Sequence, residues 1–78
     1  MQDQIDELTL LLLYLTSFTE RNDFPEMPRS WKGYPFESLN QLTDEKYILG
    51  SRRSKSVYLT DDGIKRALEL MKKYNIET

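Results

Sequence analysis

The sequence contains no cysteine and no histidine, and its three glycines are scattered over 78 residues. Without cysteine there is no disulfide framework and no thiolate metal site, and without imidazole nearly every pairing of a catalytic nucleophile with a base is excluded. The sequence also has no phosphate-binding glycine loop, dinucleotide fingerprint or calcium loop. We therefore expect no enzyme activity, no cofactor and no metal site.

Long hydrophobic runs are also absent. The longest, from Leu10 to Leu15, is far too short to span a bilayer, and the residues before it are acidic where a secretory signal is basic. A cytoplasmic location without a membrane partner is therefore expected. The hydrophobic content of 38% and the aromatic content of 12% are typical of a folded soluble chain. A chain of this length has room for one modest core, so residues 1–78 are predicted to form a single domain.

A first helix is predicted from Gln2 to about Glu20, because apolar residues recur there at spacings of three and four. The face expected to be buried consists of Ile5, Leu8, Leu11, Leu12, Leu15 and Phe18. Leu10, Leu13 and Tyr14 lie on the opposite side, where either the following loop or a second copy of the chain covers them. We favour a homodimer through these three residues together with Leu70 and Tyr74, because a domain this small gains from a shared core.

Residues 21–32 are predicted to form a loop with a short helical piece, since prolines and turn-forming polar residues interrupt them. Pro35 suits the first position of a helix that runs to about Glu45, and Phe36, Leu39 and Leu42 line its expected buried face. Trp31 is expected to be a core anchor rather than an exposed recognition residue. Together these segments have the outline of a helix-turn-helix.

The pattern then changes from helical to alternating. Residues 47–49 and 56–60 are predicted strands, and the polar connection between them predicts an antiparallel hairpin. Thr60 is expected to cap a last helix, from Asp61 to about Tyr74, in which Asp61 and Asp62 complement the positive end of the helix dipole. This electrostatic role explains the adjacent carboxylates better than a catalytic one does.

Leu59, Thr60 and Gly63 form a Leu-Thr-x-x-Gly sequence at the end of the hairpin. With the order of elements over residues 31–70, this sequence resembles the winged helix-turn-helix domains of the MarR and PadR families. The resemblance implies an α+β fold with three helices, a basic β-hairpin wing and a C-terminal helix, and it implies a DNA-binding transcriptional regulator. Where those families commonly have glycine after the recognition helix, this chain has Lys46, for which a left-handed turn costs about 1 to 2 kcal/mol.

The whole chain is also similar to an uncharacterised family of short bacterial proteins. The shared elements are an Ile-Asp-Glu-Leu-Thr start, a Trp-Lys-Gly-Tyr element and a Lys-Ser-Val-Tyr-Leu-Thr strand, here residues 5–9, 31–34 and 55–60. This resemblance suggests that the winged-helix unit is the complete protein, and it implies no activity.

Positive charge is concentrated in the predicted hairpin. Residues 51–60 contain three cations, Arg52, Arg53 and Lys55, and no acid. We expect these three to contact DNA phosphates or to enter the minor groove. Arg29 and Lys32 are the expected further phosphate contacts, and Asn40 and Gln41 are expected to read base edges.

The predicted recognition helix carries the opposite charge. Glu37 and Asp44 share its outward face with Asn40 and Gln41, and carboxylates repel phosphates. Two functions remain open. One is a DNA-binding transcriptional regulator that acts as a homodimer, and the other is a winged-helix protein-interaction module whose acidic helix face binds a basic partner without useful DNA binding.

Overall fold

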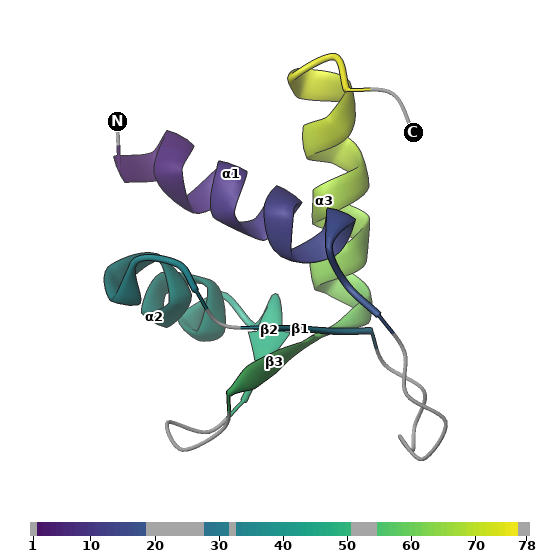
Figure 1. The fold of residues 1–78 in the computed structure, drawn as a ribbon. Helices are drawn as coiled ribbons and strands as arrows, with labels where there is room; N and C mark the ends of the chain where they lie inside the picture. The colour runs from purple at the N-terminus through teal and green to yellow at the C-terminus, as the bar shows by residue number, and fades with distance from the viewer. Residues whose placement is uncertain (1, 19–27, 32, 51–54, 77–78) are drawn as a thin grey trace.

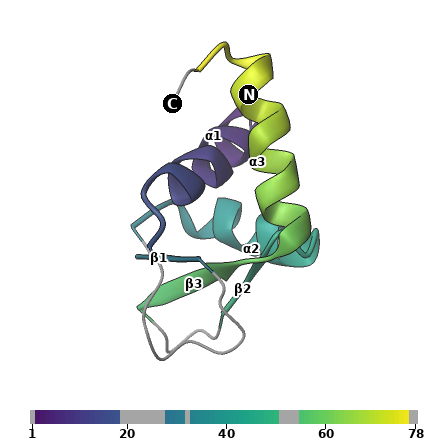
Figure 2. The same cartoon turned by 90° about the vertical axis from the view of Figure 1, so that its right-hand side faces the viewer.

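A computed structural model describes residues 2–18, 28–31, 33–50 and 55–76. Its elements, in chain order, are α1 (Gln2–Leu15), β1 (Arg29–Trp31), α2 (Phe36–Asp44), β2 (Ile48–Leu49), β3 (Ser56–Leu59) and α3 (Asp61–Lys73). The strands form one antiparallel sheet in the order β1-β3-β2, and α1 packs against both other helices and against β1 (Figures 1 and 2). The predicted α+β class is confirmed. In the part of the chain described, no helix has the length and apolar character needed to cross a membrane.

Strand β1 lies where the sequence predicted a loop with a helical piece. It pairs with β3 in the register Arg29↔Tyr58, Ser30↔Val57 and Trp31↔Ser56. Three residues are too few to show an alternating pattern, and the partner strand follows 27 residues later, so this pairing was invisible to local periodicity. Residues 29–31 are therefore a strand, and the predicted helical piece is not found in residues 28–31. The rest of that segment, residues 19–27, lies outside the described residues.

Helix α1 is turned the opposite way from the sequence prediction. Leu10 and Leu13 are 1% and 0% exposed, whereas Leu8 and Leu12 of the predicted buried face are 41% and 47% exposed. Only Leu11 of that predicted face is fully buried. The prediction failed because α1 is apolar on both sides and because polar residues lie on its buried side. Those residues are satisfied locally: Thr9 donates to the Ile5 carbonyl at 2.7 Å, and Asp6 accepts from Gln2 at 2.9 Å.

The predicted dimer residues belong to the core of the single chain. Leu10, Leu13 and Leu70 are at most 1% exposed, and Tyr14 and Tyr74 pack against the same cluster. The remainder of that cluster comes from all the other elements except β1, namely Leu39, Leu42, Ile48, Val57, Leu59 and Ala67. Leu10, Leu13 and Leu70 are therefore not available for a dimer contact, because they are buried in the core of the single chain, whereas Tyr14 and Tyr74 are only partly buried.

Two aromatic residues that were predicted to be buried are exposed. Trp31 is 59% exposed and lies with its ring 5.4 Å from that of Phe18. It faces outward because Ser30, its neighbour in β1, takes the inward position of the strand. Phe36 is 67% exposed because α1 approaches the first turn of α2 at Ser38, whose hydroxyl lies 3.4 Å from the Gln2 amide.

Helix α2 ends in a left-handed turn at Lys46, the position at which the MarR and PadR families commonly have glycine. Lys46 has a φ of 65°, its N–H donates to the Thr43 carbonyl, and the Tyr47 N–H donates to the Leu42 carbonyl, both at 3.0 Å. These two bonds form a Schellman motif. Lys46 therefore accepts a backbone strain of about 1 to 2 kcal/mol that a glycine would avoid.

The predicted cap of α3 is confirmed. The Thr60 hydroxyl accepts from the Gly63 N–H at 3.0 Å and donates to the Lys46 carbonyl at 2.7 Å. The Thr60 N–H donates to the Tyr47 carbonyl at 3.1 Å. One threonine therefore starts α3 and fastens it to the turn that ends α2.

Candidate functional site

Two of the predicted phosphate contacts, Lys55 and Arg29, lie at the start of β3. Lys55 is exposed at the residue before β3. From β1, the Arg29 guanidinium donates to the hydroxyl of Ser56, the residue after Lys55, with Nη2 at 2.7 Å and Nε at 3.2 Å. The same guanidinium lies 5.0 Å from the centre of the Tyr58 ring. Arg29 is thus held against β3, at the residue that follows Lys55.

The predicted base-reading residues lie on the exposed face of α2. Asn40 and Gln41 are both exposed, and the Gln41 amide donates to the Glu45 carboxylate at 2.7 Å. Glu37 and Asp44 are exposed on the same helix, which contains no lysine or arginine. The face is therefore acidic, as its sequence indicated. The other predicted phosphate contacts, Lys32, Arg52 and Arg53, lie outside the described residues.

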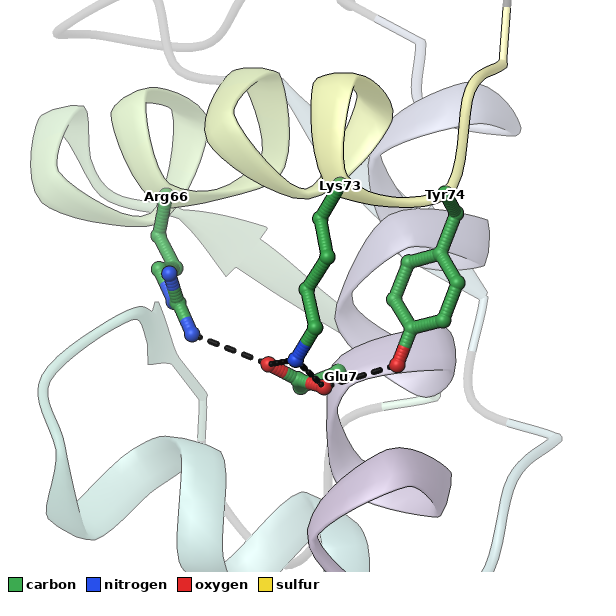
Figure 3. A network of polar contacts seen from close by, with 4 residues as sticks. All are labelled: Glu7, Arg66, Lys73 and Tyr74. Atoms are coloured by element: carbon green, nitrogen blue, oxygen red, sulfur yellow. Dashed lines mark hydrogen bonds and ion pairs between the residues drawn. The ribbon is translucent and has the colours of Figure 1, made fainter.

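A polar cluster that the sequence did not reveal joins α1 to α3 (Figure 3). Glu7 on α1 accepts from Lys73 Nζ at 2.8 Å, from Arg66 at 3.0 Å and from the Tyr74 hydroxyl at 2.7 Å. We call Glu7, Arg66, Lys73 and Tyr74 the Glu7 cluster. The Glu7 side chain is only 14% exposed, whereas that of Lys73 is 54% exposed. No short-range sequence signal could find the cluster, because 59 to 67 residues separate Glu7 from its partners.

The Glu7 cluster shifts the protonation equilibria of its members. Hydrogen bonds from Lys73 and then Tyr74 hold the pKa of the Glu7 carboxyl below its ordinary value of 4.5. The hydrogen bonds to Glu7 raise the pKa values of Lys73 and Tyr74 in turn. A carboxyl whose pKa is lower in the folded state stabilises that state above its unfolded-state pKa. This stabilisation is lost as the pH falls through the folded-state value.

We expect Glu7→Gln to remove part of the acid sensitivity of the protein. At pH 7 the variant should lose about 1 kcal/mol of unfolding free energy, a modest figure because Lys73 is half exposed and solvent screens it. Below pH 4.5 the two stabilities should converge. Urea denaturation across this pH range measures the effect, with the exposed Glu69→Gln on α3 as the control. A constant difference between wild type and Glu7→Gln at all pH values would contradict the assignment.

A cleft of about 340 Å³ lies beside the Glu7 cluster, between α1, α3 and the end of α2. Leu10, Leu42 and Leu70 contribute its apolar lining, and Asp3, Asp6 and Glu45 contribute carboxylates. The two cations on its wall, Arg66 and Lys73, already contact Glu7, so the cleft presents mainly negative charge. Among the described residues, no three Asp, Glu, His or Cys side chains come together as metal ligands.

Comparison with known proteins supplies a family. A family model described as "Domain of unknown function (DUF6429)" matches residues 1–77. The chain belongs to this family. It is similar to "Uncharacterized protein y4hR" of Sinorhizobium fredii (strain NBRC 101917 / NGR234), with 34% identity over 73 residues, which cover 92% of this chain and 89% of the relative. No solved structure matches the chain significantly. The DUF6429 family carries no stated activity, so the function of this member has to be argued from its own residues.

Proposed function

We propose that this DUF6429 protein is a transcriptional regulator of the winged helix-turn-helix type that binds the DNA backbone through its β2–β3 hairpin and acts as a homodimer. The observation that carries the proposal is the contact of Arg29 with Ser56, the residue after the exposed Lys55, where the cation-rich hairpin connection enters β3. The hairpin connection carries Arg52, Arg53 and Lys55 without an acid, and the contact between Arg29 and Ser56 adds a fourth cation at its base. Such a concentration of cations is suited to phosphates.

The order of elements also supports this proposal. A short helix, α2, is followed by an antiparallel hairpin and then by a helix that Thr60 caps, in the order that the resemblance to winged-helix regulators implies. Fold resemblance by itself does not establish a function. The proposal therefore rests on the charge of the hairpin, with which the order of elements is consistent.

The number of cations sets the expected strength of binding. Three hairpin cations with Arg29 and Lys32 allow contact with about three to five phosphates, which predicts weak binding with a steep dependence on salt. Two copies on a two-fold site would double that number and raise the affinity. The acidic face of α2, with Glu37 and Asp44, opposes close contact with the major groove, so we expect the hairpin rather than α2 to dominate the binding energy.

Fluorescence anisotropy of a labelled random duplex tests the proposal at low and at near-physiological salt. We expect binding that weakens steeply with salt and that is lost when Arg52, Arg53 and Lys55 are all replaced by alanine. Lys55→Glu and Lys65→Glu form a matched pair, because both lysines are exposed and both changes alter the net charge equally. Lys55→Glu should weaken binding at least about tenfold, whereas Lys65→Glu should change it little. Absence of binding at low salt, or equal effects of the pair, would refute the proposal.

The acidic face of α2 favours a second candidate, a protein-interaction module for a basic partner. Three carboxylates, Glu37, Asp44 and Glu45, are exposed at this helix and its C-cap. Glu37→Lys separates the two candidates in the same anisotropy experiment. It should tighten nonspecific DNA binding if the hairpin proposal holds, because it removes a charge that repels phosphate. Absence of duplex binding by both wild type and Glu37→Lys at low salt would favour the interaction module.

A further inference from the structure

Helix α1 carries an exposed apolar face on the side opposite its core residues. Ile5, Leu8, Leu12 and Leu15 are between 37% and 47% exposed, and we call these four residues the α1 stripe. In both Figures 1 and 2, α2 lies below α1 and α3 lies beside it. Four large apolar side chains aligned on one helix form a contiguous patch, unlike isolated exposed leucines, which are ordinary.

The spacing of the α1 stripe indicates the shape of what binds there. Its residues follow one another at intervals of three, four and three, the spacing at which side chains of one helix interlock with those of another. The stripe extends along about 15 Å of helix axis. The partner that fits such a surface is therefore a second helix with a similar apolar row.

The charge around the α1 stripe indicates which helix that is. No lysine or arginine occurs in α1. Its carboxylates Asp3, Asp6 and Glu7 all line the cleft between α1, α3 and the end of α2, and Gln2 and the Glu7 cluster contact the last two. The stripe therefore offers nothing to an acidic or basic peptide or to phosphate. Helices that bind anionic lipid surfaces carry cations beside their apolar face, which α1 lacks. An identical stripe is equally apolar and uncharged, and a two-fold axis brings such a patch against itself.

We propose that the α1 stripe is a self-association surface that pairs with the α1 stripe of a second copy of this chain. This inference rests on the proposed function only in naming the surface that a DNA-bound homodimer would use. The α1 stripe takes the place of the predicted contact through Leu10, Leu13 and Leu70, because these three residues are buried in the core. One face of a short helix buries an area at the small end of the range for specific interfaces. We therefore expect a dissociation constant in the micromolar range.

Sedimentation velocity without DNA tests the inference, with the protein between about 5 and 500 µM. Wild type should shift from monomer to dimer over this range, whereas the double variant Leu8→Gln, Leu12→Gln should remain monomeric. Both side chains are more than 40% exposed, so circular dichroism should show that the variant is folded. Leu68→Gln, which removes a leucine of 46% exposure on α3, is the matched control and should dimerise like wild type.

Three results would overturn the inference: a wild type that stays monomeric, a double variant that still dimerises, or a Leu68→Gln variant that loses the dimer as completely. DNA is absent from the experiment, so failure of self-association is distinguishable from failure of DNA binding. If the dimer forms through the stripe and anisotropy shows no duplex binding, the surface stands and the proposed function falls.

Discussion

Replacing Gly63 with alanine is expected to destabilise the protein by at least about 3 kcal/mol and to lower its Tm by more than about 10 °C. An alanine Cβ at this position would clash with the Tyr47 carbonyl oxygen and would lie 2.9 Å from the Tyr47 carbonyl carbon. Both atoms are backbone, so a rotamer change cannot relieve the clash. The first turn of α3 would have to separate from the turn that ends α2. Thermal and urea denaturation followed by circular dichroism measure the loss.

The direction of this effect is opposite to the one that helix propensity predicts. Within a helix, alanine is ordinarily about 1 kcal/mol more favourable than glycine. The φ of Gly63 is not positive, so close approach rather than backbone conformation requires the glycine. Gly33→Ala is the control, because nothing lies within 4 Å of the added Cβ, and its stability should stay close to wild type. If Gly63→Ala were as stable as wild type, α3 and Tyr47 would not approach as closely as described.

Leu13→Ala should cost about 2 to 5 kcal/mol, whereas Leu12→Ala should change the stability by less than about 1 kcal/mol. The two leucines are neighbours in α1, so both substitutions remove the same side-chain atoms and gain the same helix propensity. Their surroundings differ, because Leu13 is 0% exposed inside the core and Leu12 is 47% exposed on the α1 stripe. Truncation of Leu13 leaves a cavity among α2, α3 and the sheet, and this cavity adds to the lost transfer free energy.

This comparison also decides how α1 is turned. The spacing of apolar residues alone places Leu12 on the core face and Leu13 on the opposite side of α1, and this orientation would give Leu12→Ala the larger effect. Urea denaturation should be carried out at low micromolar protein concentration, so that self-association through the α1 stripe does not add to the stability of wild type. A larger loss for Leu12→Ala than for Leu13→Ala at this concentration would contradict the described orientation of α1.

Much of the local structure could be predicted because the interactions that form it lie within a few residues. The hairpin, the extent of α2 and α3, and the buried Leu39 and Leu42 all follow from periodicity and turn chemistry. Thr60 was identified as a cap from its position before two acidic residues, and its bond to the Gly63 N–H spans only three residues. The candidate phosphate contacts were likewise chosen from local charge, and that choice stays a prediction for all of them.

The sequence by itself determined where the helices and the two hairpin strands begin, how α3 is capped and where positive charge is concentrated, because each depends on neighbours along the chain. Only the tertiary structure decided which side of α1 is buried. Both sides are apolar, and the choice depends on α2, α3 and the sheet covering one of them. Tertiary contact also created β1, through pairing with a strand 27 residues away, and the Glu7 cluster, through partners at least 59 residues away. Contacts at such separations leave no periodic trace in the sequence, since their free energy comes from surfaces that meet only after the chain has folded.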